Sequence, residues 1–214
     1  MDTQSVCSLE MTNIETAKRI MGGNLVELGD LNSLIDSPFS QIDLDFFSNI
    51  PFSEELLEKC QHSHILIPGL EMSVLDAYLV APTIRFLFDS DPWWIEEDFA
   101  TQQKTKKQWY LIRRAVMPES IDRPYDQQVQ IVKAKGEEVP RGCELICAMI
   151  FYYLVTGIRL FEKIMSHCSD ISIDGVHFHV GFFQKGHIDV RGYSNHGLVK
   201  NVCIAGMKKA ELVI

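Results

Sequence analysis

Apolar and polar residues alternate most regularly near the end of the chain, between residues 175 and 195. The even positions are apolar: Val176, Phe178, Val180, Ile188 and Val190. The odd positions are polar: His177, His179, His187, Asp189, Arg191, Tyr193 and Asn195. Because side chains alternate between the two faces of a strand, the sets belong to opposite faces. The pattern predicts a β-hairpin that turns at 184–186, with an apolar inner face and a chemically varied outer face.

A second pattern predicts the helix at the centre of the core. The stretch from Glu144 to Val155 is apolar nearly all round, follows Pro140 and ends before Gly157. Proline near the first turn and glycine just past the end are typical of helix boundaries. A helix without a polar face is normally buried. We therefore expect this segment to pack on all sides.

The remaining pattern predicts short elements of both kinds. We expect helices over 14–21, 53–61, 73–79 and 125–132. We expect further strands over 64–67, 108–113 and 202–205, and we interpret 32–51 as a loop-rich connector. This mixture indicates an α+β fold. We divide it into an acidic, helical and loop-rich N-terminal region at 1–61 and an α+β domain with a central buried helix and C-terminal antiparallel strands at 62–214.

Charge is unevenly distributed along the chain. Residues 1–100 hold 18 Asp and Glu against 4 Lys and Arg, a net charge of −14, whereas residues 101–214 hold 11 against 16, a net charge of +5. An acidic first half disfavours nucleic-acid binding, because phosphate contacts need clustered cations. We interpret the basic cluster of the second half as a partner for the chain's own acidic half rather than for nucleic acid. That cluster is Lys104, Lys106, Lys107, Arg113 and Arg114.

The sequence shows neither an export signal nor a membrane span. Residues 1–11 lack the basic and apolar regions of a signal peptide, and the apolar run 145–155 is about half the roughly 20 residues that a membrane helix needs. We therefore expect a cytoplasmic protein with no membrane partner. In that compartment the six cysteines are expected to be reduced and mostly buried.

Histidine offers the most specific candidate chemistry. His177 and His179 share a strand face, and His187 follows the proposed turn. Three imidazoles on one face could ligate a transition metal and leave a position for water. The alternative is that they are exposed polar positions of a hairpin. We favour the alternative and expect no cofactor, because no carboxylate stands at a fixed ligand spacing.

Other candidate groups have structural explanations. Cys168 and Asp170 follow His167 closely, but neighbouring residues on an extended chain point in different directions and rarely form a catalytic dyad. The tryptophans could stack on a ligand, but we interpret them as core aromatics. These are Trp93, Trp94 and Trp109, of which the first two lie in an acidic, aromatic block at 91–99.

Several stretches between about His62 and Met207 resemble a family of uncharacterised bacterial proteins. They are 64–70, 108–114, 138–141, 152–162, 168–170, the Gly175 to Phe182 region and 205–208. The end of the chain is also similar to C-type-lectin-like domains, including formylglycine-generating-type proteins and the variable proteins of diversity-generating retroelements. This resemblance implies that the last strands present a binding surface, so that the odd residues of the hairpin would face a ligand. The calcium triplets of sugar-binding lectins are missing from the sequence.

Three functions are compatible with these patterns. The first is a non-enzymatic binding module that recognises a protein or other ligand through the odd residues of 177–195. The second is a metal-dependent enzyme that uses His177, His179 and His187. The third is an acidic regulator from a mobile element, whose N-terminal half competes with nucleic acid. We favour the first, because a simply solvated face would be richer in Lys, Glu and Thr.

Overall fold

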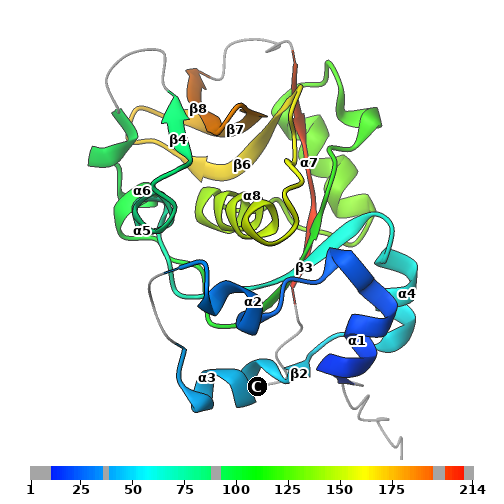
Figure 1. Ribbon diagram of the computed structural model, residues 1–214. Coiled ribbons are helices and arrows are strands. Elements are labelled where there is room, and N and C mark those ends of the chain that lie inside the picture. The colour runs from blue at the N-terminus through cyan, green and yellow to red at the C-terminus, as the bar shows by residue number, and fades with distance from the viewer. Residues whose placement is uncertain (1–10, 36–38, 88–92, 195–200, 210–214) are drawn as a thin grey trace, which may run out of the picture.

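The fold is a mixed α+β arrangement around one buried helix. The computed structural model describes residues 11–35, 39–87, 93–194 and 201–209, which form eight α-helices and three sheets. Helix α8 (Gly142–Thr156) runs between a five-stranded sheet and a three-stranded sheet (Figure 1). The predicted α+β class is confirmed.

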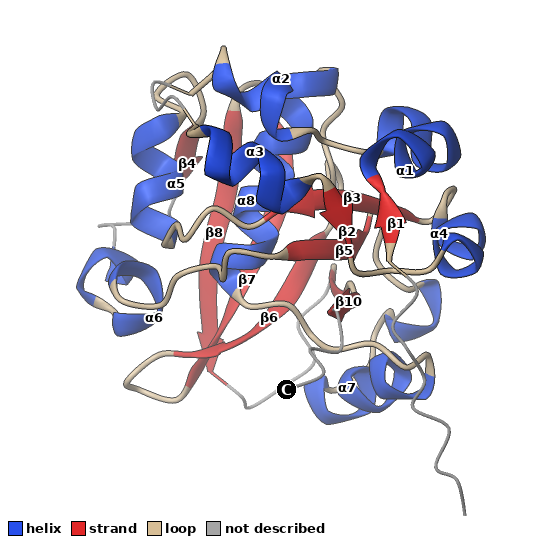
Figure 2. Cartoon of the chain, turned by 90° about the horizontal axis from the view of Figure 1, so that it is seen from below, coloured by secondary structure: helices blue, strands red, loops and turns tan. Residues whose placement is uncertain are grey.

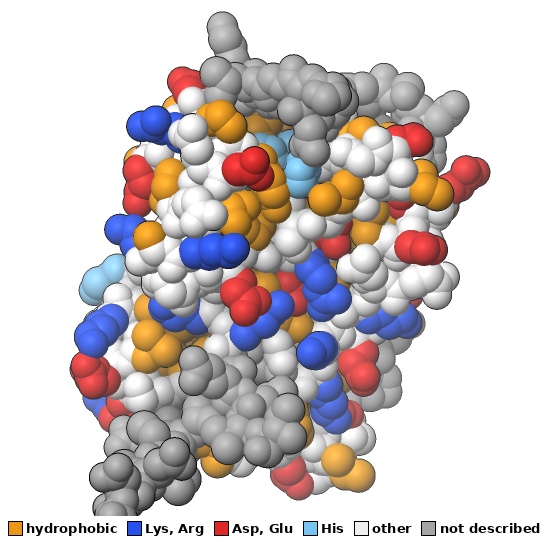
Figure 3. Space-filling model, turned by 180° about the vertical axis from the view of Figure 1, so that it is seen from behind, with side chains coloured by type: hydrophobic (Ala, Val, Ile, Leu, Met, Phe, Trp, Pro, Cys, Tyr) orange, Lys and Arg blue, Asp and Glu red, His pale blue; other side chains and the backbone are white. Residues whose placement is uncertain are grey.

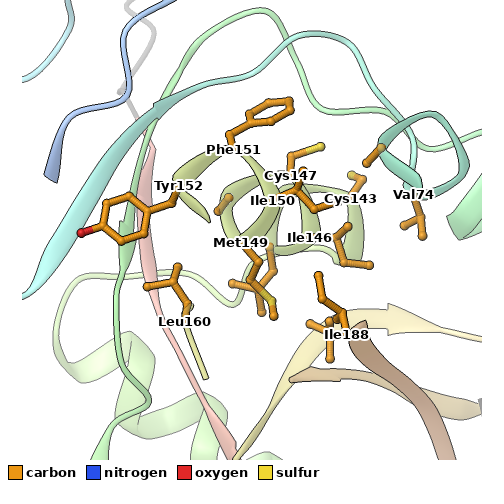
Figure 4. Packing of buried hydrophobic residues seen from close by; sticks show 14 of the residues in the cluster. Val74, Cys143, Ile146, Cys147, Met149, Ile150, Phe151, Tyr152, Leu160 and Ile188 are labelled. Atoms are coloured by element: carbon orange, nitrogen blue, oxygen red, sulfur yellow. The ribbon is translucent and has the colours of Figure 1, made fainter. Parts of the chain in front are cut away.

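Helix α8 is buried because its sequence offers no polar face. Every residue from Gly142 to Tyr152 is buried, and Figure 4 shows α8 side chains packed near Val74, Leu160 and Ile188. At its start the Asp170 carboxylate accepts a hydrogen bond from the Gly142 N–H. At its end Gly157 has a φ of 73° and donates to the Tyr153 carbonyl, as left-handed C-terminal glycines do. The predicted central helix is confirmed.

The five-stranded sheet contains the predicted hairpin. Its order is β4-β8-β7-β6-β9, formed by β4 (Arg85–Leu87), β6 (Met165–Ile171), β7 (Val176–Gln184), β8 (His187–Ser194) and β9 (Val202–Ile204). The three central strands pair antiparallel, while both edge strands pair parallel to their neighbours. The inner face is apolar as predicted, and Phe178, Val180, Ile188 and Val190 are all buried.

The three-stranded sheet has two buried faces. It consists of β3 (His64–Pro68), β5 (Trp109–Arg113) and β10 (Met207–Lys209), all antiparallel. Ile65, Ile67, Tyr110 and Ile112 belong to the core around α8. The alternate residues Leu66, Trp109 and Leu111 pack against the N-terminal region instead. Strands buried on both faces read as continuous apolar runs, which is the pattern of 64–67 and 108–113.

The N-terminal region covers the second face of this sheet. It comprises β1 (Thr12–Asn13), α1 (Ile14–Met21), η1 (Gly22–Asn24), α2 (Leu28–Asn32), α3 (Gln41–Phe47), β2 (Asn49–Ile50) and α4 (Glu54–Cys60). The prediction of a loop-rich connector over 32–51 was wrong, because α3 and β2 lie within it. Ser40 and Asp43 form a reciprocal capping box that starts α3. The proposed boundary at residue 61 stays a prediction.

The other helices flank α8 or cover the larger sheet (Figure 2). They are α5 (Val74–Val80), η2 (Trp93–Glu96), α6 (Asp98–Thr101), η3 (Pro118–Ser120) and α7 (Tyr125–Ala134). Helices α5 and α6 contact α8, whereas α7 packs on β9, where Val132 meets Met117 and Ile204. Within the described ranges, no helix has both the length and the hydrophobicity that a membrane span requires.

Two other sequence predictions can be compared with the fold. Lys104 pairs with Asp76 at 3.2 Å and Lys107 pairs with Asp43, so these two basic residues do neutralise the acidic half of the chain. Arg113 instead pairs with Glu137, which lies in the second half. The described cysteines are all free and buried, as predicted: Cys60, Cys143, Cys147, Cys168 and Cys203.

Candidate functional site

The odd residues of the hairpin do share one face of the sheet. His177 pairs with Tyr193, and His179 pairs with Arg191, across β7 and β8. Cross-strand partners point to the same side, so the predicted division between apolar and polar faces is confirmed. The Tyr193 side chain and all of Asn195 lie outside the described part of the structure.

The expectation that this face is exposed was wrong for three of its residues. His177, His179 and Asp189 retain 5%, 1% and 8% of their accessible surface, while His187 and Arg191 are half-buried. The sequence could not indicate this, because part of the covering layer comes from α7, some fifty residues earlier in the chain. A polar face buried by a distant helix has the same alternation as a polar face in water.

The three histidines of the alternative metal hypothesis, His177, His179 and His187, do not converge. His179 pairs with Arg191, four residues along β8 from His187, and that spacing corresponds to about 13 Å along a strand. Among the residues with described positions, no group of three His, Cys, Asp or Glu side chains could hold a metal ion. His187 instead pairs with Gln184 across a register shift and with Arg85 of β4.

A different histidine joins His177 and His179. His167 of β6 is the direct cross-strand partner of His179, and the two ring centroids are 4.2 Å apart. The His167 and His177 centroids are 6.0 Å apart. Tyr125 from α7 covers these rings, with its centroid 3.9 Å from that of His177 and 5.0 Å from that of His167. We call His167, His177 and His179 the imidazole cluster.

Gln128 of α7 fixes the proton on His167. Its Nε2 donates to the carbonyls of Ser120 and Val202, at 3.0 and 3.1 Å. Both amide hydrogens are thereby used, so Oε1 must be the atom that lies 2.7 Å from Nδ1 of His167. Oε1 can only accept, and His167 therefore carries its hydrogen on Nδ1. Because Gln128 is fully buried, this contact is shielded from water.

Burial keeps the imidazole cluster neutral. Desolvation, together with the neighbouring His177, lowers the pKa of His167 to about 4. Desolvation and the nearby His167 lower the pKa of His179 to about 3. Burial also lowers the pKa of His177, although Asp126 opposes that shift. Removing a cation from water is costly, so at neutral pH these three rings are uncharged.

A groove opens at the end of the β6–β7 pair where the two strands are joined. It has a volume of 660 Å³ and lies between η2–α6 and the turn that joins β6 to β7. Its lining is Trp93, Glu96, Glu97, Asp98, Phe99, Gln103, Ile171, Ser172, Ile173 and Asp174. The aromatic wall is continuous with the core, since Phe99 stacks on Phe178 with centroids 4.6 Å apart. Trp94 is fully buried, as expected of a core aromatic, whereas Trp93 is only half-buried.

The lining of this groove is strongly acidic. It contains four carboxylates and neither Lys nor Arg, and no ion pair joins those carboxylates to a basic side chain within the described segments. The Glu97 carboxylate accepts a hydrogen bond of 3.1 Å from the Ile173 N–H, which ties the β6–β7 turn to η2–α6. Ile173 itself is 91% exposed. The sequence predicted an acidic, aromatic block at 91–99 but could not place it beside 171–174.

The face opposite to that of Figure 1 shows imidazole atoms at the surface over a small area, beside hydrophobic side chains (Figure 3). His167 and His177 retain 7% and 5% of their accessible surface. The cluster and the groove are thus different features, one nearly closed and the other open.

No known protein family, curated protein or solved structure matches the chain. The resemblances to a bacterial family and to C-type-lectin-like domains therefore stay predictions.

Proposed function

We propose that the chain is a binding module that takes a cationic side chain of a partner protein into the acidic groove. The observation that carries this proposal is the groove's lining, in which four carboxylates stand around Trp93 and Phe99 and have no basic partner among the residues that the structure describes. A lysine or arginine side chain combines a charged end with an apolar stem. Such a side chain matches both halves of the lining.

The chemistry of the wall supports a cation rather than a neutral ligand. An ammonium or guanidinium group over a tryptophan face gains about 0.5–2 kcal/mol, the larger value when water is excluded. Carboxylates add attraction and accelerate encounter with a basic partner. Trp93 is held in place by Phe99 and Phe178, with centroid separations of 6.0 and 6.5 Å. A rigid aromatic wall costs little entropy when a ligand binds.

The rim of the groove favours a protein partner. Ile171 and Ile173 are 52% and 91% exposed, and apolar side chains at the edge of a polar hollow are typical of protein-interaction sites. The proposal keeps recognition near the strands that the sequence analysis singled out, but at the β6–β7 turn instead of the outer hairpin face. A C-type-lectin-like assignment, supported by a helix that precedes paired strands, stays part of this proposal.

The proposal is tested with a short fluorescent peptide that carries three lysines, and with the same peptide acetylated on each lysine. Fluorescence anisotropy at low and physiological salt measures binding of both. We expect the lysine peptide to bind and the acetylated peptide not to bind, because acetylation removes the charge. Affinity should fall with added salt, since exposed carboxylates are screened.

Matched double variants locate the site. Glu96→Gln with Asp98→Asn removes two exposed charges from the groove and should weaken binding about tenfold. Glu54→Gln with Glu58→Gln removes two exposed charges from α4 and should leave binding unchanged. Equal weakening by both pairs would mean that only net charge matters, and the groove assignment would then be wrong.

A further inference from the structure

The contact between α7 and the larger sheet has two parts of different chemistry. One part is apolar and consists of Val132 against Met117 and Ile204. The other part is polar and nearly closed to water, with Tyr125 and Gln128 lying over the imidazole cluster. An apolar contact does not respond to pH in this range, whereas a contact made by imidazoles does.

We infer that the imidazole cluster is a proton-sensitive switch: α7 stays on the sheet while the three rings are neutral, and their protonation releases α7. The first reason is crowding. The His167 ring lies 4.2 Å from that of His179 and 6.0 Å from that of His177, centroid to centroid. A proton on one ring therefore places a charge against two further basic groups in a site of low dielectric.

The second reason is the hydrogen bonding of His167 and His177. The hydrogen on Nδ1 of His167 is already used by Gln128, so a second proton must go to Nε2. Nδ1 of His177 is buried without a hydrogen-bond partner among the described residues. A protonated His177 would have to leave that buried donor unsatisfied, which disfavours the cation.

The surroundings compensate only in part for a positive charge. Backbone hydrogen bonds of Cys203 with His167 and of Arg191 with His179 favour protonation, but burial outweighs both. From α7, Asp126 favours protonation of His177, while Tyr125 is neutral, because burial raises its pKa to about 12. From β8, Arg191 is itself a cation and is paired with Asp189 at 2.7 Å. From β9, burial raises the pKa of the Cys203 thiol. On β6, Cys168 is likewise protonated, and Asp170 is bound to the start of α8.

Opening of α7 removes these penalties because it returns the rings to water. The pKa of His167 is about 4 in the closed arrangement, against 6.5 for a free imidazole. Linkage then predicts that lowering the pH from 7 to 5 shifts the opening equilibrium about 20-fold through this residue alone. Helix α8 contains no histidine, and burial raises the pKa of Asp170 at its start to about 6, so acidification acts there in the opposite direction and α7 should open first.

Hydrogen–deuterium exchange of the full chain at pH 7 and pH 5, corrected for the intrinsic exchange rate, tests this inference. We expect protection of 125–134 to fall by about 20-fold or more, with little change over 145–155. His167→Gln, which keeps a hydrogen-bonding side chain but cannot be protonated, should remove about 20-fold of that response. His62→Gln, at an exposed position of the surface, should keep the full response.

A second measurement does not depend on how the variants fold. Nitrogen-15 spectra of the histidines in the unmodified protein should show His167 protonated on Nδ1 at pH 7, and its titration should coincide with the loss of α7 protection. The inference is wrong if His167 titrates near 6.5 while α7 stays protected. It is equally wrong if α7 and α8 lose protection together, or if His167→Gln keeps the full pH response.

Discussion

At the scale of single residues, Gly192 provides the space that Trp93 occupies. A Cβ atom at this position would lie 2.8 Å from Cζ2 of Trp93 and 2.8 Å from Cγ1 of Val176. Both contacts are too short for carbon atoms, so one side chain must move. The wall of the groove is therefore set from β8 as well as from η2.

We predict that Gly192→Ala destabilises the protein by about 1–3 kcal/mol through overpacking, and that it weakens lysine-peptide binding because Trp93 is displaced. Chemical denaturation and anisotropy measure the two effects. Gly157→Ala is the informative comparison, since nothing lies within 4 Å of its added carbon. Gly157→Ala should lower the free energy of unfolding only through the strain of the positive φ, and it should leave lysine-peptide binding unchanged.

Glu137 is a buried charge with several partners. Arg113 donates two hydrogen bonds to its carboxylate, of 2.7 and 2.9 Å, and Nε2 of His64 lies 3.3 Å from Oε1. Although burial opposes ionisation, the contacts with His64 and Arg113 lower the pKa of Glu137. The carboxylate thus joins β3 and β5 to the loop before α8.

We predict that Glu137→Gln costs about 3 kcal/mol in the free energy of unfolding, because it leaves Arg113 without its charge partner in a largely buried site. Urea denaturation measures this loss. Glu138→Gln is a suitable control, since Glu138 contacts Lys209 from a side chain that is 65% exposed and should change stability by less than about 1 kcal/mol. Similar losses for both variants would contradict the argument.

At the scale of secondary-structure elements, the turn between β6 and β7 should contribute to peptide binding but little to the free energy of unfolding. Ile173 is 91% exposed and lines the groove. We predict that Ile173→Ser changes the free energy of unfolding by no more than about 0.5 kcal/mol but weakens peptide binding several-fold. Ile121→Ser, at a residue that is 47% exposed and far along the chain, should leave binding unchanged. Equal binding by both variants would exclude the rim from the site.

Periodicity predicted those elements whose two faces differ or whose faces are all apolar. The hairpin of β7 and β8 and the buried helix α8 were found this way. Strand β6 was missed, because Ser166, His167 and Asp170 make it polar and its register shifts between His167 and Ile171. The strand pairing that brings His167 beside His179 was consequently missed as well.

The position of α7 explains why the polar face of the hairpin was wrongly expected to be exposed. The helix itself was predicted from 125–132, but nothing in its sequence indicates which surface it covers. Gln128 contacts both Val202 of β9 and His167 of β6, so its position depends on the pairing of these two strands. The groove could not be predicted for the same reason, because its two sides come from residues 93–103 and 171–174. Both sites depend on contacts between distant segments, which a single sequence does not specify.

At the scale of the whole molecule, pH changes the free energy of unfolding through the buried imidazole cluster and through the buried carboxyl group of Asp170. The two contributions have opposite directions. The lowered pKa values of the imidazole cluster stabilise the fold above about pH 6.5, and this contribution is lost as the pH falls through 6.5 towards 4. Asp170 behaves in the opposite way. Burial raises its pKa to about 6, so its contribution is present below about 3.8 and is lost as the pH rises through 6.

Between pH 7 and pH 5 the two effects compete, and the histidines outnumber the carboxyl group. On acidification, His167 and His179 together lower the free energy of unfolding by about 4 kcal/mol, while Asp170 raises it by about 1 kcal/mol. The free energy of unfolding should therefore fall by about 2–3 kcal/mol. Asp170→Asn removes the opposing contribution and should make the fall steeper, even if the variant is less stable at both pH values. Denaturation curves at pH 7 and pH 5 measure these slopes. An unchanged slope for Asp170→Asn would show that Asp170 is already ionised at pH 5, and the balance of charges proposed for this core would then be incorrect.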